Sequence, residues 1–266
     1  MFRRLTPVAK NILIINVAIF MISSFLKLPL SEFFGLRVVF SSEFAPYQFL
    51  TYMWLHGGFG HILGNMIAVL VFAPMLEGVW GSKRFLTFYL ICGIGAGVLY
   101  GTADFFEKLP LKQDAEAYLD NPTPEGFERF IIQHKNPYFN LNGLGELSDA
   151  YYENENNLGI ISQTKRVVEE TYEIFVTRGN MIGASGAVFG ILFAFAFLFP
   201  NTELFLLFPP IPIKAKYLVF FYAMYEIYSE FNRTAGDNVA HLAHIGGMLI
   251  AFLLLKFWKN DTRKFY

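Results

Sequence analysis

The sequence predicts an all-α, polytopic membrane protein with six transmembrane helices and a long external insertion between helices 3 and 4. The first reason is composition: 54% of the 266 residues are hydrophobic and 16% are charged, whereas soluble domains carry about 25% charged residues. The second is a series of uncharged runs of roughly 16 to 24 residues, near the length that crosses about 30 Å of hydrocarbon. A core of this size cannot hide so much apolar surface from water, so lipid is the expected solvent.

The charge and cysteine counts exclude several other classes of protein. Intrinsic disorder needs low hydrophobicity, and nucleic-acid binding usually needs a basic excess, yet the chain has 21 basic and 22 acidic residues. Cys92 is the only cysteine. An intrachain disulfide and a thiolate zinc cage are therefore both impossible.

The positions of the six spans follow from the uncharged runs. The fifth is interrupted by Glu226, and the second begins after a loop that holds Pro46 and two glycines. The chain is accordingly divided into residues 1–103 with the first three helices, the insertion at 104–178, and residues 179–266 with the last three. The predicted spans are Asn11–Leu26, Gly60–Gly78, Phe85–Ala103, Gly179–Thr202, Tyr217–Ser229 and Asn238–Leu255.

Basic residues set the expected orientation, because positively charged loops stay in the cytoplasm. Most basic residues fall on one side of the predicted spans, and the short loops on the opposite side contain only Lys27, Arg37 and Arg233. Both termini are thus predicted to be cytoplasmic. No cleavable signal and no transit segment is recognised, so we expect a multi-pass protein of a bacterial plasma (inner) membrane. The residues on the predicted cytoplasmic side are Arg3, Arg4, Lys10, Lys83, Arg84, Lys214, Lys216, Lys256, Lys259, Arg263 and Lys264.

The insertion at 104–178 is rich in Asp, Glu, Asn, Tyr and Pro and holds no spanning run. Glu125–Gln133 and Thr164–Phe175 have the periodicity of amphipathic helices. The pattern favours a mobile external insertion near the lipid surface, and a docking element for substrates or partners is the alternative. Turns are predicted at Asn121-Pro122, at Lys135-Asn136-Pro137 and at Asn142-Gly143.

Three motifs stand out within the apolar spans. Gly183-Ala184-Ser185-Gly186 opens the fourth helix, and taken alone its small residues indicate close helix packing. The elbow Gly-x-Ser-x-Gly of α/β-hydrolases does not apply, because position 187 is Ala. His244 lies inside the sixth span, where a polar group is costly unless it is paired. His241, three residues earlier, is predicted to make an interfacial hydrogen bond.

The third motif opens the second helix. His61 and Asn65 are four residues apart and share one helix face, where the alternative role is polar contact between helices. Helices two, four and six all run from outside to inside in the predicted topology. The three motifs therefore lie at similar depth near the outer membrane face.

This arrangement permits nucleophilic acyl transfer. Ser185 would attack once His244 takes its proton, and the same imidazole would later protonate the leaving amine. The Asn65 amide, the His61 imidazole and the backbone N–H of Ser185 would stabilise the oxyanion. No acidic residue is evidently placed to orient His244, since Asp237 lies near the surface and Glu226 is on another helix. A Ser-His dyad is the simplest prediction.

On these residues the chain resembles the rhomboid intramembrane serine proteases, six-helix proteins that cut the transmembrane segments of other proteins. The resemblance covers roughly 28–103 and 179–258 and implies that Ser185 is the nucleophile and His244 the base. It implies oxyanion roles for His61 and Asn65, with Gly183 beside them at the oxyanion or substrate-binding site. The motifs are His61-Ile-Leu-Gly-Asn65, Gly183-Ala184-Ser185-Gly186 and Ala243-His244-Ile245-Gly246-Gly247.

The resemblance also implies that Gly186 and Gly247 are packing glycines, that no cofactor or metal is needed, and that the partners are transmembrane substrates and the lipid bilayer. Substrates would enter laterally near the fifth helix. The chain departs from the family in two places. Tyr47-Gln48 stands where a Trp-Arg pair is common, and the insertion is not part of the common core.

Three other functions stay open. An inactive rhomboid-like membrane chaperone or quality-control factor would bind transmembrane segments without cutting them. A zinc transporter or another metal protein would use the imidazoles, although His-Glu-x-x-His is absent. A channel or secondary transporter is less favoured, because no inverted repeat is visible. The four histidines of the metal hypothesis are His56, His61, His241 and His244.

Overall fold

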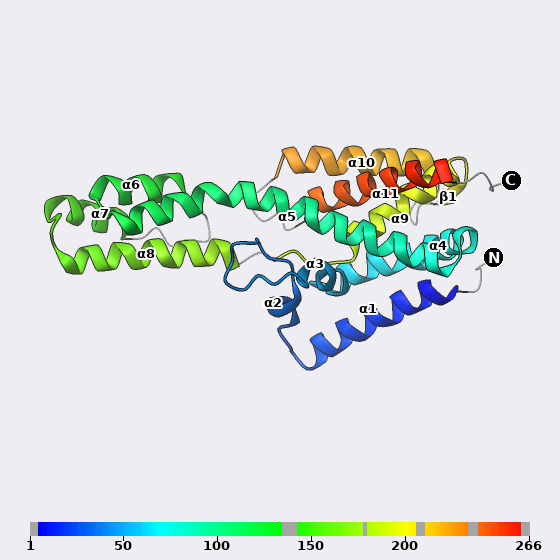
Figure 1. The fold of residues 1–266 in the computed structure, drawn as a ribbon, viewed down its shortest axis with the longest axis horizontal. Coiled ribbons are helices and arrows are strands. Elements are labelled where there is room, and N and C mark those ends of the chain that lie inside the picture. The colour runs from blue at the N-terminus through cyan, green and yellow to red at the C-terminus, as the bar shows by residue number, and fades with distance from the viewer. Residues whose placement is uncertain (1–4, 135–142, 178–179, 206–210, 234–238, 262–266) are drawn as a thin grey trace. The chain divides into compact units, whose positions relative to one another are not determined.

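The computed structural model describes residues 5–134, 143–177, 180–205, 211–233 and 239–261 (Figure 1). The chain forms two compact units. The first, here called the membrane unit, comprises Met1–Leu36, Phe44–Thr102 and Asn180–Tyr266. The second, here called the insertion unit, comprises Arg37–Glu43 and Ala103–Gly179.

The membrane unit is built from apolar helices, with one short hairpin that joins two of them. The hairpin pairs β1 (Glu203–Phe205) with β2 (Pro212–Lys214) in antiparallel fashion, and Leu204 stands opposite Ile213. The long helices are α1 (Pro7–Phe25), α4 (Phe59–Trp80), α5 (Ser82–Asp120), α9 (Ser185–Leu198), α10 (Ala215–Phe231) and α11 (His241–Asp261). Shorter turns connect them, namely α2 (Leu30–Phe34), α3 (Gln48–Thr51) and the 3₁₀ turn η1 (Tyr52–Trp54).

Four of the described helices are long and apolar enough to cross a membrane: α1, α4, α5 and residues 241–258 of α11. The helix α9 is apolar but has only 14 residues, and α10 has 17. Each predicted span coincides with one of these six helices, yet a six-span topology stays a prediction, because two helices are shorter than the hydrocarbon layer requires.

Two predicted helix ends were wrong. The third helix does not end near Ala103, since α5 continues to Asp120 and shares its C-terminal part with the insertion unit. The fourth helix begins at Ser185, several residues after the predicted start. The residues before it are extended, because Met181 and Leu36 exchange backbone hydrogen bonds of 2.9 Å in both directions.

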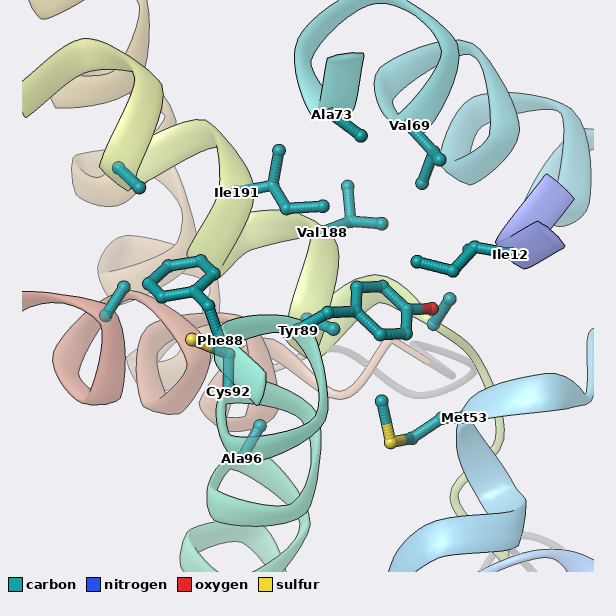
Figure 2. Close-up of a cluster of buried hydrophobic side chains, with 14 of the residues drawn as sticks. Ile12, Met53, Val69, Ala73, Phe88, Tyr89, Cys92, Ala96, Val188 and Ile191 are labelled. Atoms are coloured by element: carbon teal, nitrogen blue, oxygen red, sulfur yellow. The ribbon is translucent and has the colours of Figure 1, made fainter. Parts of the chain in front are cut away.

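The helix α9 lies at the centre of the membrane unit and packs against α4, α10 and α11. Figure 2 shows its Val188 and Ile191 beside Phe88 and Tyr89 of α5, with Val69 and Ala73 of α4 nearby. A helix that is apolar on every face is stable only when it is surrounded. Nine of the fourteen residues of α9 are buried, which explains the absence of a polar stripe.

Glycines bring α9 and α11 into direct backbone contact. A Cβ atom added at Gly247 would overlap the carbonyl oxygen of Gly186, and one added at Gly186 would lie 2.6 Å from Cβ of Ala96. One turn further along, a Cβ added at Gly190 would lie 3.2 Å from the carbonyl oxygen of Gly247. The predicted packing roles of Gly186 and Gly247 are thus confirmed.

A buried carboxylate fixes the start of α1. Glu77 of α4 accepts hydrogen bonds from the backbone N–H groups of Val8 (3.0 Å) and Ala9 (2.9 Å), and Ser82 donates a third, of 2.6 Å. The first N–H groups of a helix have no intrahelical partner, and the helix dipole favours an anion there. Glu77 therefore connects α1 to the turn between α4 and α5.

The insertion unit is folded around its own hydrophobic core. It contains the C-terminal part of α5 together with α6 (Pro124–Gln133), α7 (Leu144–Glu153) and α8 (Leu158–Thr177). Inside it the Tyr118 hydroxyl donates to Oγ1 of Thr164 at 2.6 Å. The core side chains are Leu111, Ala115, Tyr118, Phe127, Phe130, Tyr151 and Val168.

Both amphipathic helices predicted for the insertion are confirmed, since they lie within α6 and α8. The start of α6 has a polar cap: Oγ1 of Thr123 accepts from the backbone N–H of Gly126 at 3.1 Å. The helix α7 was not predicted. The turn predicted at Lys135-Asn136-Pro137, and Asn142 of the turn after it, lie outside the described residues.

We expect Gly247→Ala to destabilise the membrane unit. The added methyl group has no room against Gly186, and overpacking a core typically costs about 1–3 kcal/mol. The measurement is thermal unfolding of the purified protein in detergent. Gly64→Ala is the matched control, because a Cβ added at Gly64 of α4 meets nothing within 4 Å and still gains the helix propensity of alanine. An unchanged unfolding temperature for Gly247→Ala would contradict the close contact.

Candidate active site

The segment before α9 holds the backbone that leads into Ser185. Beyond the bridge between Leu36 and Met181, the backbone N–H of Gly183 donates to the carbonyl oxygen of Tyr52 at 3.0 Å. Gly183 has φ +129°, a conformation that side chains other than glycine rarely adopt. Ser185 follows as the first residue of the helix and is half-buried.

Gly183 lies between two of the predicted site residues. A Cβ added to it would be 2.6 Å from Nε2 of His61 and 3.7 Å from Oγ of Ser185. The imidazole of α4 and the hydroxyl of α9 therefore flank the same glycine. A side chain at this position would fill the space beside them, so glycine is required by backbone angle and by room.

The tautomer of His61 is indicated by its other ring nitrogen. The backbone N–H of Gly57 donates to Nδ1 of His61 at 3.4 Å. In a neutral imidazole one nitrogen accepts and the other donates. The proton then resides on Nε2, the atom nearest Gly183, where it is available as a hydrogen-bond donor.

His244 of α11 lies flat against Phe189 of α9. The ring centroids are 4.2 Å apart and the planes differ by 11°. Phe189 is one helical turn after Ser185, and the glycine contact between the two helices keeps this part of α11 close to α9. The stack limits rotation of the imidazole about its own side chain.

Asn65 is buried one turn after His61 on α4, with 7% of its surface exposed. Its Nδ2 amide has no hydrogen-bond partner among the described residues. An unpaired buried donor normally costs about 1–3 kcal/mol. The amide is therefore available to a group that enters the site from outside the protein.

His56 stands next to this group without joining it. Its ring packs edge-on against His61, with centroids 5.0 Å apart, and neither of its nitrogens has a hydrogen-bond partner among the described residues. Burial, and after it the neighbouring His61, lowers the pKa of His56 to about 3. His56 is therefore neutral at physiological pH.

An acidic residue lies beside His244, although none was evidently placed there in the sequence. Oε2 of Glu226 on α10 lies 2.5 Å from Nδ1 of His241 and 2.9 Å from Nδ1 of His244. All three side chains are buried. In the sequence, Glu226 was set aside because it is on another helix, although a carboxylate in an apolar helix is itself a signal of function. Asp237 lies outside the described residues.

The chain matches the family model of the Rhomboid domain over residues 43–108 and 160–259. These ranges make up more than half of the chain and include every site residue described above. The chain belongs to the rhomboid family. It is a multi-pass integral membrane protein of that family, and the resemblance in the three sequence motifs is thereby confirmed.

Individual relatives agree with this family. An uncharacterized mitochondrial rhomboid protein of Schizosaccharomyces pombe is 29% identical over 78% of this chain and 50% of its own length. The mitochondrial RHOMBOID-like protein 6 of Arabidopsis thaliana is 39% identical over 27% of this chain and 22% of its own. YdcA of Bacillus subtilis, whose name provisionally describes a rhomboid protease, is 42% identical over 18% of this chain and 24% of its own.

The rhomboid chain spans half of the first of these relatives and about a quarter of the other two. Two carry a mitochondrial name and one comes from a bacterium. The relatives therefore do not favour the predicted bacterial membrane over an organelle membrane.

The metal hypothesis grouped four histidines, and the structure arranges them differently. His241 and His244 both contact Glu226, and one possible ligand atom from each of these three residues lies within 4.8 Å of the other two. His56 and His61 contact each other instead. Ligands of a tetrahedral zinc ion at about 2.1 Å stand about 3.4 Å apart. The observed separations of 2.5 Å and 2.9 Å are instead those of direct hydrogen bonds.

Proposed function

We propose that this rhomboid protein is an intramembrane serine endopeptidase that hydrolyses peptide bonds in or near the transmembrane segments of other membrane proteins. The observation that carries the proposal is the meeting of three helices at one place. Ser185 and His61 flank Gly183, and the backbone contact between α9 and α11 brings His244 onto the same end of α9. Nucleophile, base and donor groups thus come from separate helices.

The reaction needs only groups of the protein and water. Ser185 Oγ attacks the carbonyl carbon of the scissile peptide bond while His244 accepts its proton. The tetrahedral intermediate collapses, the C–N bond breaks, and the imidazolium gives the proton to the leaving amine. Water then attacks the Ser185 ester with His244 again as base, which releases the acid and restores the hydroxyl. No metal or organic cofactor takes part in this scheme.

Oxyanion stabilisation is assigned to donors on α4 and α9. These are the Nδ2 amide of Asn65, Nε2 of His61 and the backbone N–H of Ser185. The role of Asn65 is supported by its amide, which has no partner in the part of the chain that the structure describes. The role of His61 is supported by the contact at its Nδ1, which leaves the proton on Nε2. Preorganised donors of this kind act strongly because they need no reorganisation as charge develops. Gly183 keeps this space open.

The alternative is a rhomboid relative that binds transmembrane segments without cutting them. Ser185 and His244 are both present. The buried Asn65 amide, which no described residue pairs, has no evident use in a protein that only binds apolar helices. The hydrolase is therefore favoured. The two functions differ in one measurable property, which is the nucleophilicity of Ser185.

The orientation proposed with this function has both termini in the cytoplasm and the site near the outer face, because basic residues concentrate on one side. Expression of single-cysteine variants in bacteria would test it, in a Cys92→Ala background. A membrane-impermeant maleimide should modify Lys27→Cys in intact cells and Lys83→Cys only after the membrane is opened. The reverse pattern would overturn the orientation.

Treatment of the detergent-purified protein with a fluorophosphonate probe should label Ser185. Ser185→Ala and His244→Ala should not be labelled, since one loses the nucleophile and the other its base. Thermal unfolding of each variant provides the folding control. Absence of label on wild type, with an active rhomboid protease labelled in parallel, would favour the non-cutting relative. Full labelling of His244→Ala would overturn its assignment as base.

Asn65→Ala should separate function from stability. Loss of one oxyanion donor typically lowers the rate about 10²–10³-fold, and we expect a fall of this size in the labelling rate. Thermal stability should be equal to wild type or higher, because the variant removes an unpaired buried donor. Asn16→Ala is the control: it removes a buried amide that donates to the carbonyl of Ile12 at 2.7 Å, so it should lose stability and keep the labelling rate.

A further inference from the structure

Glu226 is a buried carboxylate inside an apolar helix. Its side chain is 5% exposed, and the two imidazoles that contact it are 3% (His241) and 11% (His244) exposed. A carboxylate without water costs several kcal/mol unless charged or hydrogen-bonding groups surround it. The helix α10 is otherwise open along much of its length, with Phe220, Phe221, Tyr225 and Tyr228 exposed. The Glu226 carboxylate is thus directed toward α11, where it contacts His241 and His244.

Both imidazoles approach one oxygen, Oε2, through Nδ1. The contact from His241 is a hydrogen bond of 2.5 Å, which fixes the carboxylate in place. The contact from His244 is 2.9 Å long. A carboxylate only accepts hydrogen bonds, so a neutral imidazole that faces it carries its proton on Nδ1. Nε2 of His244 then holds the free lone pair that a general base requires.

The His244 contact has the distance of a hydrogen bond without its alignment, because Nδ1 of His244 makes no hydrogen bond of good geometry. Catalytic hydrogen bonds are often poorly aligned in an empty site and tighten only in the reacting complex. The Phe189 ring stacks on the His244 imidazole and restricts the positions that this imidazole can take.

We propose that Glu226 is a positioning residue for His244 and is itself held in place by His241. The site then operates with a Ser185–His244–Glu226 triad instead of a simple dyad. This inference rests on the proposed hydrolase function. Glu226 selects the His244 tautomer with Nε2 free, and its negative charge stabilises the imidazolium that forms when Ser185 gives up its proton. These are the roles of the third residue in Ser-His-Asp hydrolases.

The test compares the fluorophosphonate labelling of wild type, Glu226→Gln and Glu226→Asp, with the binding constant of the probe and the maximal rate of covalent labelling determined separately. Glu226→Gln keeps the shape but removes the charge, and we expect the maximal rate to fall by up to about 10⁴-fold. The binding constant should not change, because Glu226 does not touch the probe. Glu226→Asp retains the charge but moves the carboxylate back by one methylene, so its maximal rate should lie between those of wild type and Glu226→Gln.

Glu230→Gln is the matched control. Glu230 lies one turn further along α10, where it pairs with Arg233, and its variant should label at the wild-type rate. Thermal unfolding separates catalytic loss from misfolding. If Glu226→Gln does not fold, the Glu226→Asp variant decides the matter: its carboxylate is displaced by one methylene, so an unchanged maximal rate would overturn the proposal.

The remaining outcomes distinguish this inference from the function on which it rests. Wild-type protein that is not labelled at all would overturn both. If wild type is labelled and Glu226→Gln folds and is labelled at the same rate, the role of Glu226 is overturned and a Ser-His dyad remains. Labelling that changes when EDTA is added and returns with Zn²⁺ would also overturn it, because Glu226, His241 and His244 would then be ligands of a metal.

Discussion

The rest of the membrane unit depends on the backbone contact between α9 and α11. Gly186 and Gly247 allow these helices to approach until main-chain atoms touch. In lipid there is little hydrophobic drive for helices to associate, so close packing between small residues supplies most of it. The contact also fixes the relative depth of the two helices. As a result, Ser185 at the start of α9 and His244 in the first turns of α11 share one level without any covalent link.

The polar side chains near Ser185 and His244 are of two kinds, those that contact one another and those without a partner in the part of the chain that the structure describes. Glu226, His241 and His244 compensate one another, which lets a carboxylate remain buried in an apolar unit. Asn65 keeps a buried amide nitrogen without a partner among the described residues. A structure selected for stability alone would pair or remove such groups. Their cost is acceptable where a site must present donors to a group that is not yet bound.

The sequence predicted what depends on local pattern and missed what depends on packing. Uncharged runs located the six apolar helices because lipid demands apolar residues over a fixed length. The three motifs predicted that the ends of α4, α9 and α11 hold the polar residues of one site, and the contact of His244 with Phe189 is consistent with that prediction. Glu226 was missed because it is 15 residues before His241 on another helix, and only the packing of α10 against α11 makes them neighbours. The start of α9 was placed too early, since the pairing of Met181 with Leu36 spans 145 residues of chain.

The insertion unit illustrates how a membrane fold accepts additional sequence. The family model leaves out residues 109–159, a stretch that contains α6, α7 and the end of α5. All of it lies within the unit that has its own hydrophobic core. The apolar side chains of this unit are buried against one another. A segment with its own hydrophobic core can in principle fold as a unit, which is one way for a membrane protein to carry sequence that its family model leaves out.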